Sequence, residues 1–185
     1  MKLLAILCAV LLLIACQANP SKPSGPQYEN LIQKVPLPDG KWKVYQKNEN
    51  WVLETMWQHE SRKDFVKTFV IYNEQRDIEE HKINDDRIGL ESCGNFKSTL
   101  IINARENGYD ALTWFSVCSK QNGFYTKSFN KVIKGNDSSY MVRRVWRAEP
   151  SEQEWQTWKK YYQSIIVCDS RLDESPCPGG YTKVN

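Results

Sequence analysis

The chain has 185 residues, with 25 lysines and arginines against 22 aspartates and glutamates, a net charge of +3. This balance is too even to indicate nucleic-acid binding, and the length suits one folded domain plus a tether. Seven tryptophans supply ample aromatic material for a packed core.

The N-terminus has the pattern of a secretory signal peptide. Lys2 gives a positive start, and the run from Leu3 to Ala15 is apolar apart from Cys8. A bilayer core of about 30 Å requires about 20 apolar residues, so this run is too short to be retained as a membrane-spanning helix.

The end of this run, Leu13-Ile14-Ala15-Cys16, resembles the lipobox of bacterial lipoproteins. The resemblance implies cleavage between Ala15 and Cys16 and acylation of Cys16. Gln17 in place of Asp after that cysteine resembles lipoproteins sent on to the outer membrane. We therefore expect a lipid-anchored protein of the cell envelope, at the outer membrane and facing the periplasm. The alternative is an ordinary signal peptide cut elsewhere, with Cys16 incidental.

Three segments follow from this pattern: a signal peptide at 1–15, a lipidated tether at 16–40 and a single domain at 41–185. Proline and glycine favour an extended tether, although Tyr28 to Val35 could instead dock on the domain. The tether contains five prolines, namely Pro20, Pro23, Pro26, Pro36 and Pro38.

The first half of the domain is predicted to contain three strands and a helix. Strands are expected at 42–45, 51–57 and 65–72. The acidic segment 73–86 is interpreted as a solvated loop or the approach to a helix. A helix is predicted at 88–107 because apolar side chains recur there at spacings of three and four, namely Cys93, Phe96, Leu100, Ile101 and Ala104.

The second half repeats this order of elements. Strands are predicted at 110–120, 124–134 and 140–148, with Asn122-Gly123 in a hairpin turn. Ser151 and Glu154 form the pattern of a capping box, which predicts the start of a helix. One face of that helix is apolar, with Trp155, Trp158, Tyr162, Ile165 and Ile166.

The expected fold is therefore α+β: an antiparallel sheet of about six strands in the order β-β-β-α-β-β-β-α. Both helices are expected on one face of the sheet.

Four cysteines remain once Cys8 leaves with the signal peptide and Cys16 carries lipid. An even number in an exported chain predicts disulfides, with three possible connectivities. We predict that Cys93 pairs with Cys118, and Cys168 with Cys177. Metal binding is the alternative, but the chain has no CxxC motif and only two histidines, so no metal and no cofactor is expected.

No nucleophile or phosphate-loop motif is present, so we predict that the protein is not an enzyme. His59 and His81 lie in polar segments, where exposed loop histidines are common. Six basic residues fall on adjacent predicted strands and form either a solvated face or a surface for an acidic partner, a glycan or a lipid headgroup. They are Lys127, Lys131, Lys134, Arg143, Arg144 and Arg147.

Three functions are considered. The first is a non-catalytic envelope lipoprotein that contacts other proteins, such as an accessory component of an envelope or secretion assembly. The second is a periplasm-facing module that binds a small ligand or glycan in a cavity between sheet and helices, lined by Trp114, Trp146 and Trp155. A hydrolase ranks last. A pocket of several hundred cubic ångströms favours the second function, and a filled interior favours the first.

Overall fold

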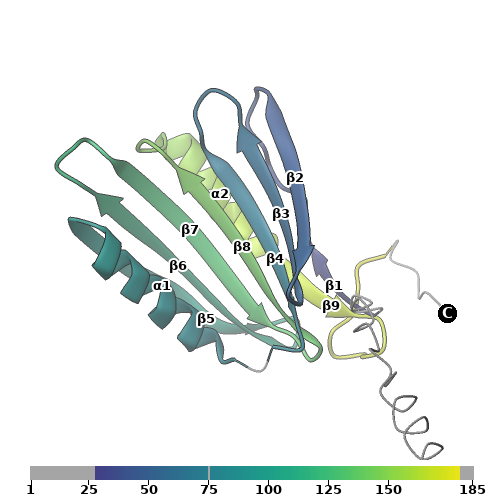
Figure 1. Cartoon of the computed structure of the whole chain (residues 1–185). Helices are drawn as coiled ribbons and strands as arrows, with labels where there is room; N and C mark the ends of the chain where they lie inside the picture. Colours follow the sequence, from purple (N-terminus) through teal and green to yellow (C-terminus); the bar gives the residue numbers. More distant parts are fainter. Residues whose placement is uncertain (1–27, 75, 180–185) are drawn as a thin grey trace, which may run out of the picture.

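A computed structural model describes residues 28–74 and 76–179 of the chain. Within these residues it has nine strands and two helices. Seven strands form one antiparallel sheet in the order β2-β3-β4-β8-β7-β6-β5, while β1 and β9 form a separate two-stranded sheet (Figure 1). The α+β class with an antiparallel sheet is as predicted, but there are more strands than the six expected.

The large sheet consists of two meanders. The first contains β2 (Trp42–Glu49), β3 (Val52–His59) and β4 (Phe65–Tyr72). The second contains β5 (Asn95–Glu106), β6 (Tyr109–Ser119), β7 (Tyr125–Lys134) and β8 (Ser138–Trp146). The last strand of each meander pairs with the other, β4 with β8, so the two halves join at the centre of the sheet.

The two helices lie on opposite faces of the large sheet, which corrects the prediction of one covered face (Figure 1). Helix α1 (Ile78–Ser92) connects the two meanders and packs through Ile78 on Leu112 and Val132. Helix α2 (Glu152–Ser164) follows β8 and packs on the face that carries Ala111 and Ile133. Neighbouring residues of a strand point to opposite faces, so these two sets of side chains define two separate apolar layers.

Stacked aromatic rings fill the layer between α2 and the sheet. The Phe129 ring stacks on Tyr162 at a centroid distance of 4.3 Å and on Trp155 at 4.9 Å. Helix α2 is the element that the sequence predicts best. Its first turn is capped as expected, since Ser151 Oγ accepts a hydrogen bond from the Glu154 backbone N–H at 3.2 Å.

The prediction of a helix at 88–107 is wrong: the helix lies earlier, and most of this segment is strand β5. The pairing of β5 with β6 shifts register between Leu100 and Ile102. A bulge at this point interrupts the two-residue alternation of a strand, and apolar side chains before and after it then occur at helix-like spacings. Helix α1 instead occupies most of the acidic segment that was interpreted as a loop or helix approach.

The folded domain begins earlier than residue 41. Strand β1 (Glu29–Ile32) pairs with β9 (Ile166–Asp169), and Leu31, Val35 and Leu37 pack against the core. The described part of the predicted tether is therefore part of the domain. The predicted lipobox and the prolines at 20, 23 and 26 lie outside the described residues.

Both predicted disulfides are present. Cys93 bonds to Cys118 and Cys168 bonds to Cys177. The first ties the end of α1 to β6, and the second closes the loop after β9. Neither described helix is both long enough and apolar enough to span a bilayer.

Candidate functional site

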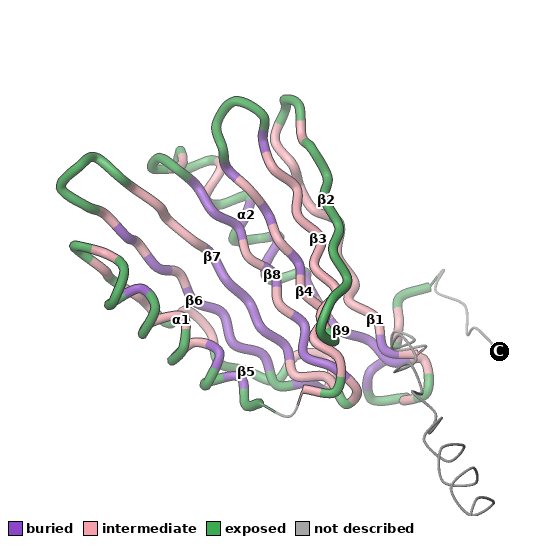
Figure 2. Tube along the Cα trace, viewed as in Figure 1, coloured by how far each residue is buried: buried purple, intermediate pink, exposed green. Residues whose placement is uncertain are grey.

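A cleft opens on the face of the sheet that α1 covers only in part. Helix α1 packs over β5, β6 and β7, which leaves the half of this face formed by β2, β3 and β4 uncovered (Figures 1 and 2). Two adjacent hollows of about 350 and 330 Å³ lie along α1, and four residues line both of them. These shared residues are Phe69, Asp85, Ile88 and Arg143. We call this feature the α1 cleft.

Close packing and a disulfide set the position of α1 beside the cleft. A Cβ atom on Gly89 would lie 2.2 Å from the ring of Phe96 on β5, so only glycine allows the helix to approach this closely. Cys93 follows the helix directly and bonds to Cys118 on β6. Helix α1, which forms one wall of the cleft, is therefore fixed to the sheet at its C-terminal end.

An ion pair crosses the middle of the cleft. Asp85 on α1 accepts hydrogen bonds from Arg143 Nη2 at 2.5 Å and from Trp114 Nε1 at 3.1 Å. Arg143 Nε also donates to Asn130 Oδ1 at 2.6 Å. This network holds the helix to β6, β7 and β8 and divides the cleft into two ends.

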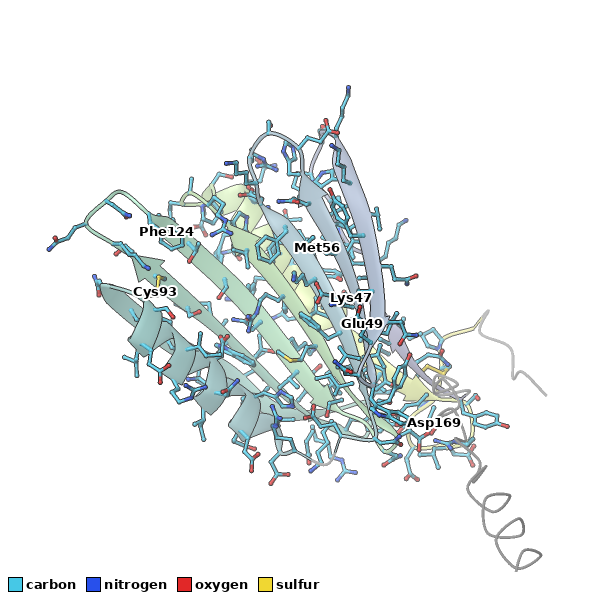
Figure 3. The ribbon with its side chains drawn as sticks, viewed as in Figure 1. Lys47, Glu49, Met56, Cys93, Phe124 and Asp169 are labelled. Carbon is cyan, nitrogen blue, oxygen red and sulfur yellow. A yellow bond between two sulfur atoms is a disulfide. The ribbon has the colours of Figure 1, made fainter. Side chains whose placement is uncertain are left out.

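The end of the cleft beside the C-terminus of α1 combines aromatic rings with cations. Phe124 and Cys93 lie at this end in Figure 3. The apolar lining comes mainly from Phe65, Phe69, Phe96, Phe124 and Val145. The charged residues of the lining are Lys67, Lys120, Arg143 and Arg147 against the single carboxylate of Asp85.

The other end of the cleft contains His81. This ring is buried, with Nε2 3.2 Å from Glu74 Oε2, and burial lowers the pKa of His81 below its ordinary value. His59 is also buried, away from the cleft lining, and its Nδ1 accepts hydrogen bonds from the backbone N–H groups of Ser61 and Arg62. Both histidines thus differ from the exposed loop histidines that the sequence suggested.

The predicted basic residues do not share one surface. Lys127, Lys131 and Arg144 point toward α2, whereas Arg143 and Arg147 line the α1 cleft on the opposite face. Lys134 pairs with Asp77 at the start of α1. The expectation of a single basic face is therefore wrong.

Lys131 is a buried cap for helix α2 and only 1% exposed. Its Nζ donates to the carbonyl oxygens of Tyr162 and Ile165, both at 2.8 Å, and to the Glu106 carboxylate. These carbonyls lie at the negative end of the helix dipole, where a cation is favourable. Burial lowers the pKa of Lys131.

Arg144 is fully buried beneath α2. Its Nη2 donates to Glu154 Oε1 at 2.9 Å and to Asp64 Oδ2 at 3.2 Å. The guanidinium lies 4.8 Å from the ring centroid of Trp146 and 5.1 Å from that of Trp158. Arg144 therefore joins β4, β8 and α2 from inside the core.

The tryptophan-lined cavity expected from the sequence is not formed. Trp114 is buried under α1, whereas Trp146 on β8 and Trp155 on α2 pack against each other on the opposite face. Aromatic rings fill the layer beneath α2, although a hollow of about 310 Å³ opens beside Trp146 at the start of this helix. The α1 cleft lies elsewhere, lined by phenylalanines of which the sequence analysis named only Phe96. Their alternation along β4, at Phe65 and Phe69, was the available signal.

Three carboxylates gather beside β1 and β9. Oxygens of Glu29, Asp137 and Asp169 lie within 4.8 Å of one another. Arg171 already bonds to Asp169 and to Asp137, and its guanidinium lowers the pKa of Asp169. Glu29 accepts from the Asn136 backbone N–H at 2.6 Å and from Tyr140 Oη at 3.1 Å, while burial raises its pKa. Arg171 supplies the positive charge, so we interpret this cluster as a structural lock.

Comparison with known proteins assigns no family. No protein-family model and no curated protein matches the chain. Among solved structures, a Pseudomonas aeruginosa protein of unknown function, described as a putative regulator, is similar with a TM-score of 0.45 and 8% identity. The similarity covers 82% of this chain and 99% of that one, and we draw no functional conclusion from it.

Proposed function

We propose that this is a lipid-anchored protein of the cell envelope, at the outer membrane and facing the periplasm. Its folded domain acts as a non-catalytic module that binds a small ligand in the α1 cleft. The lipobox at Leu13 to Cys16 supports the anchor. Ligand binding therefore ranks above contact with partner proteins, whereas the sequence alone favoured protein contact.

The observation that supports binding most directly is the α1 cleft itself. Each of its two hollows, of about 350 and 330 Å³, falls in the range of small-molecule sites. About half of the residues that line each hollow are polar or charged, and the others are apolar, with four phenylalanines in the larger hollow. Such a combination favours recognition of a ligand over structural packing alone.

Replacing Cys16 with Ser is expected to release the protein from membranes and to abolish acyl labelling. The leader for this experiment should be one that is cut directly before residue 16, so that no uncleaved signal peptide retains the chain. Fractionation and acyl labelling measure the result. Cys8→Ser is the matched control and should stay anchored, because Cys8 leaves with the signal peptide. Unchanged membrane association of the Cys16 variant would refute the anchor.

Filling the cleft is expected to abolish binding. Thr126 lines the cleft on β7, and Thr126→Trp places an indole in the space that a ligand needs. The exported Cys16→Ser chain should bind the uncharged dye phenylnaphthylamine at one saturable site, and Thr126→Trp should weaken this at least about 100-fold. Fluorescence titration measures the affinity.

Thr99→Trp provides the control. Thr99 lies on β5 opposite Phe115, on the face of the sheet away from the cleft, and this variant should bind like the parent. Thermal unfolding of both variants separates lost binding from lost folding. If the dye binds equally well to a folded Thr126→Trp chain, the cleft is not the binding site.

A second candidate is docking of a partner protein on the outer face of α1, as in an accessory component of an envelope assembly. Ile83 and Leu90 are 65% and 68% exposed and lie two helical turns apart, so they share one face. Exposed apolar side chains on one helix face are typical of a contact surface. This function is independent of the cleft, and Thr126→Trp would leave it intact.

A further inference from the structure

We propose that the ligand of the α1 cleft is an anion with an aromatic or otherwise apolar body, bound at the end beside the C-terminus of α1. This inference rests on the proposed binding function and specifies the chemistry of its ligand. It follows from which charges at that end are already neutralised and which are not.

Two of the four cations that line this end are already paired. Arg143 bonds to Asp85, which also accepts from Trp114, so the only carboxylate of the lining is engaged. Lys67 bonds to Glu54 on the neighbouring strand at 2.6 Å. These two pairs are internally balanced and do not require a ligand.

Arg147 and Lys120 are different. Within residues 28–74 and 76–179, no carboxylate oxygen lies within 4.0 Å of either side-chain cation. Both cations lie near aromatic rings instead. The Arg147 guanidinium is 5.7 Å from the ring centroid of Phe65 and 5.8 Å from that of Phe124, and Lys120 Nζ is 5.5 Å from the centroid of Phe124. Both follow directly after strands, β8 and β6, so the strands place two uncompensated positive charges at one mouth of the cleft.

The same mouth offers an apolar surface for the rest of the ligand. Phe124 is 39% exposed between the two cations, and Phe65, Phe69 and Val145 continue the apolar lining from the sheet. Aromatic rings pack against one another in stacked or edge-to-face geometry, so these phenylalanines suit a flat apolar body. A hollow of about 350 Å³ admits a small molecule with its charged group held at the rim.

The complementary ligand therefore has one acidic group, such as a sulfonate, carboxylate or phosphate, attached to an aromatic or aliphatic body. Complementary charge and shape would both contribute to its recognition. A neutral molecule of the same shape would use only the phenylalanine surface and would bind more weakly.

The test compares two dyes that share an apolar body. Anilinonaphthalenesulfonate carries a negative charge, and phenylnaphthylamine is uncharged. Both are titrated by fluorescence into the exported Cys16→Ser chain and into the double variant Arg147→Gln with Lys120→Gln. We expect the sulfonate to bind about 10-fold more tightly than the neutral dye, and we expect the double variant to remove this preference.

Lys160→Gln is the matched control, because Lys160 is an exposed lysine on α2 outside the cleft. It should leave the preference for the sulfonate unchanged. Raising the ionic strength from about 0.1 M to about 1 M shortens the Debye length from roughly 10 Å to 3 Å. This change should weaken binding of the sulfonate and leave the neutral dye unaffected or slightly tighter.

Failure of this inference and failure of the proposed function give different results. If both dyes bind equally in a manner that Thr126→Trp blocks, and the double variant changes neither affinity, the cleft binds ligands but has no preference for anions. If neither dye binds, or if Thr126→Trp changes nothing, the binding function itself is overturned. Thermal unfolding of each variant confirms that the comparison is made on folded protein.

Discussion

Arg144→Met is expected to lower the free energy of unfolding by about 3–5 kcal/mol, the range found when one partner of a buried ion pair is removed. The Arg144 side chain is completely buried and bonds to Asp64 and to Glu154. Methionine fills much of the volume but donates no hydrogen bond. Two largely buried carboxylates would then lose their closest cation and keep only the more exposed Arg62, which lies 3.7 Å from Asp64 and 3.8 Å from Glu154.

Because Arg144 is buried, we expect this loss of unfolding free energy to exceed the loss caused by removing one partner of a surface ion pair. The Arg144 guanidinium lies beside the indoles of Trp146 and Trp158, where little water screens the interaction with Glu154. Glu154 would keep its bond from Trp146 Nε1 at 2.8 Å. Asp64 also accepts from the Arg147 backbone N–H at 2.9 Å, and the turn before β4 should loosen.

Denaturant unfolding measures this effect, with Arg87→Met as the control. Arg87 pairs with Glu91 on the exposed surface of α1, and such pairs contribute less than about 0.5 kcal/mol. Arg144→Lys should fall between the two, since lysine restores the charge without the planar fork that reaches both carboxylates. An Arg144→Met variant that loses no more than Arg87→Met would show that the buried pair contributes little net stability.

The sequence predicts the elements that follow a regular period. The six predicted strands correspond to β2, β3, β4, β6, β7 and β8, and the amphipathic helix after Ser151 corresponds to α2. Most of these segments bury at least one face or one stripe of side chains, so their apolar residues recur with the period of the element. Strand β2 is the exception, since all of its residues after Trp42 are exposed. An even number of cysteines in a chain expected to be exported predicted disulfides, and the connectivity preferred among the three possible ones is the one observed.

Helix α1 and strand β5 lack that regularity. Only Ile78, His81 and Gly89 of α1 are buried, while Ile83 and Leu90 face outward, so the helix has no clear apolar stripe. Polar contacts such as the hydrogen bond from Trp114 to Asp85 attach the helix to the sheet. Such contacts leave no pattern in the spacing of apolar residues, so the sequence does not indicate them. The acidic first turn with Glu79 and Glu80 was the remaining helix signal.

The sequence predicts in part that the basic residues lie on two opposite faces of the sheet. Arg143 and Arg144 are neighbours on a strand, and their side chains must therefore point to opposite faces. What the sequence does not contain is which face each helix covers. The cleft depends on the pairing of β4 with β8 and on the path of α1 across the other half of the sheet, and both are long-range features.

Removing the Cys93–Cys118 disulfide, by changing both residues to Ala, is expected to cost about 3.5 kcal/mol of unfolding free energy. The estimate follows from the chain entropy of a loop with a separation of 25 residues. The disulfide also fixes the C-terminal end of α1, which has few buried side chains of its own. We therefore expect local opening of this end before global unfolding, with faster hydrogen exchange at the amides of the last turns of α1.

The second disulfide provides a matched comparison that separates local from global effects. Cys168 and Cys177 are nine residues apart, so changing both to Ala should cost about 2.6 kcal/mol. That variant should accelerate exchange in β1 and β9 and leave α1 protected. Only the Cys93–Cys118 variant should weaken dye binding, because only this bond lines the α1 cleft and holds Gly89 against Phe96. If both variants exchange faster in the same segments, the protein unfolds as one unit, and the disulfide does not control the width of the cleft.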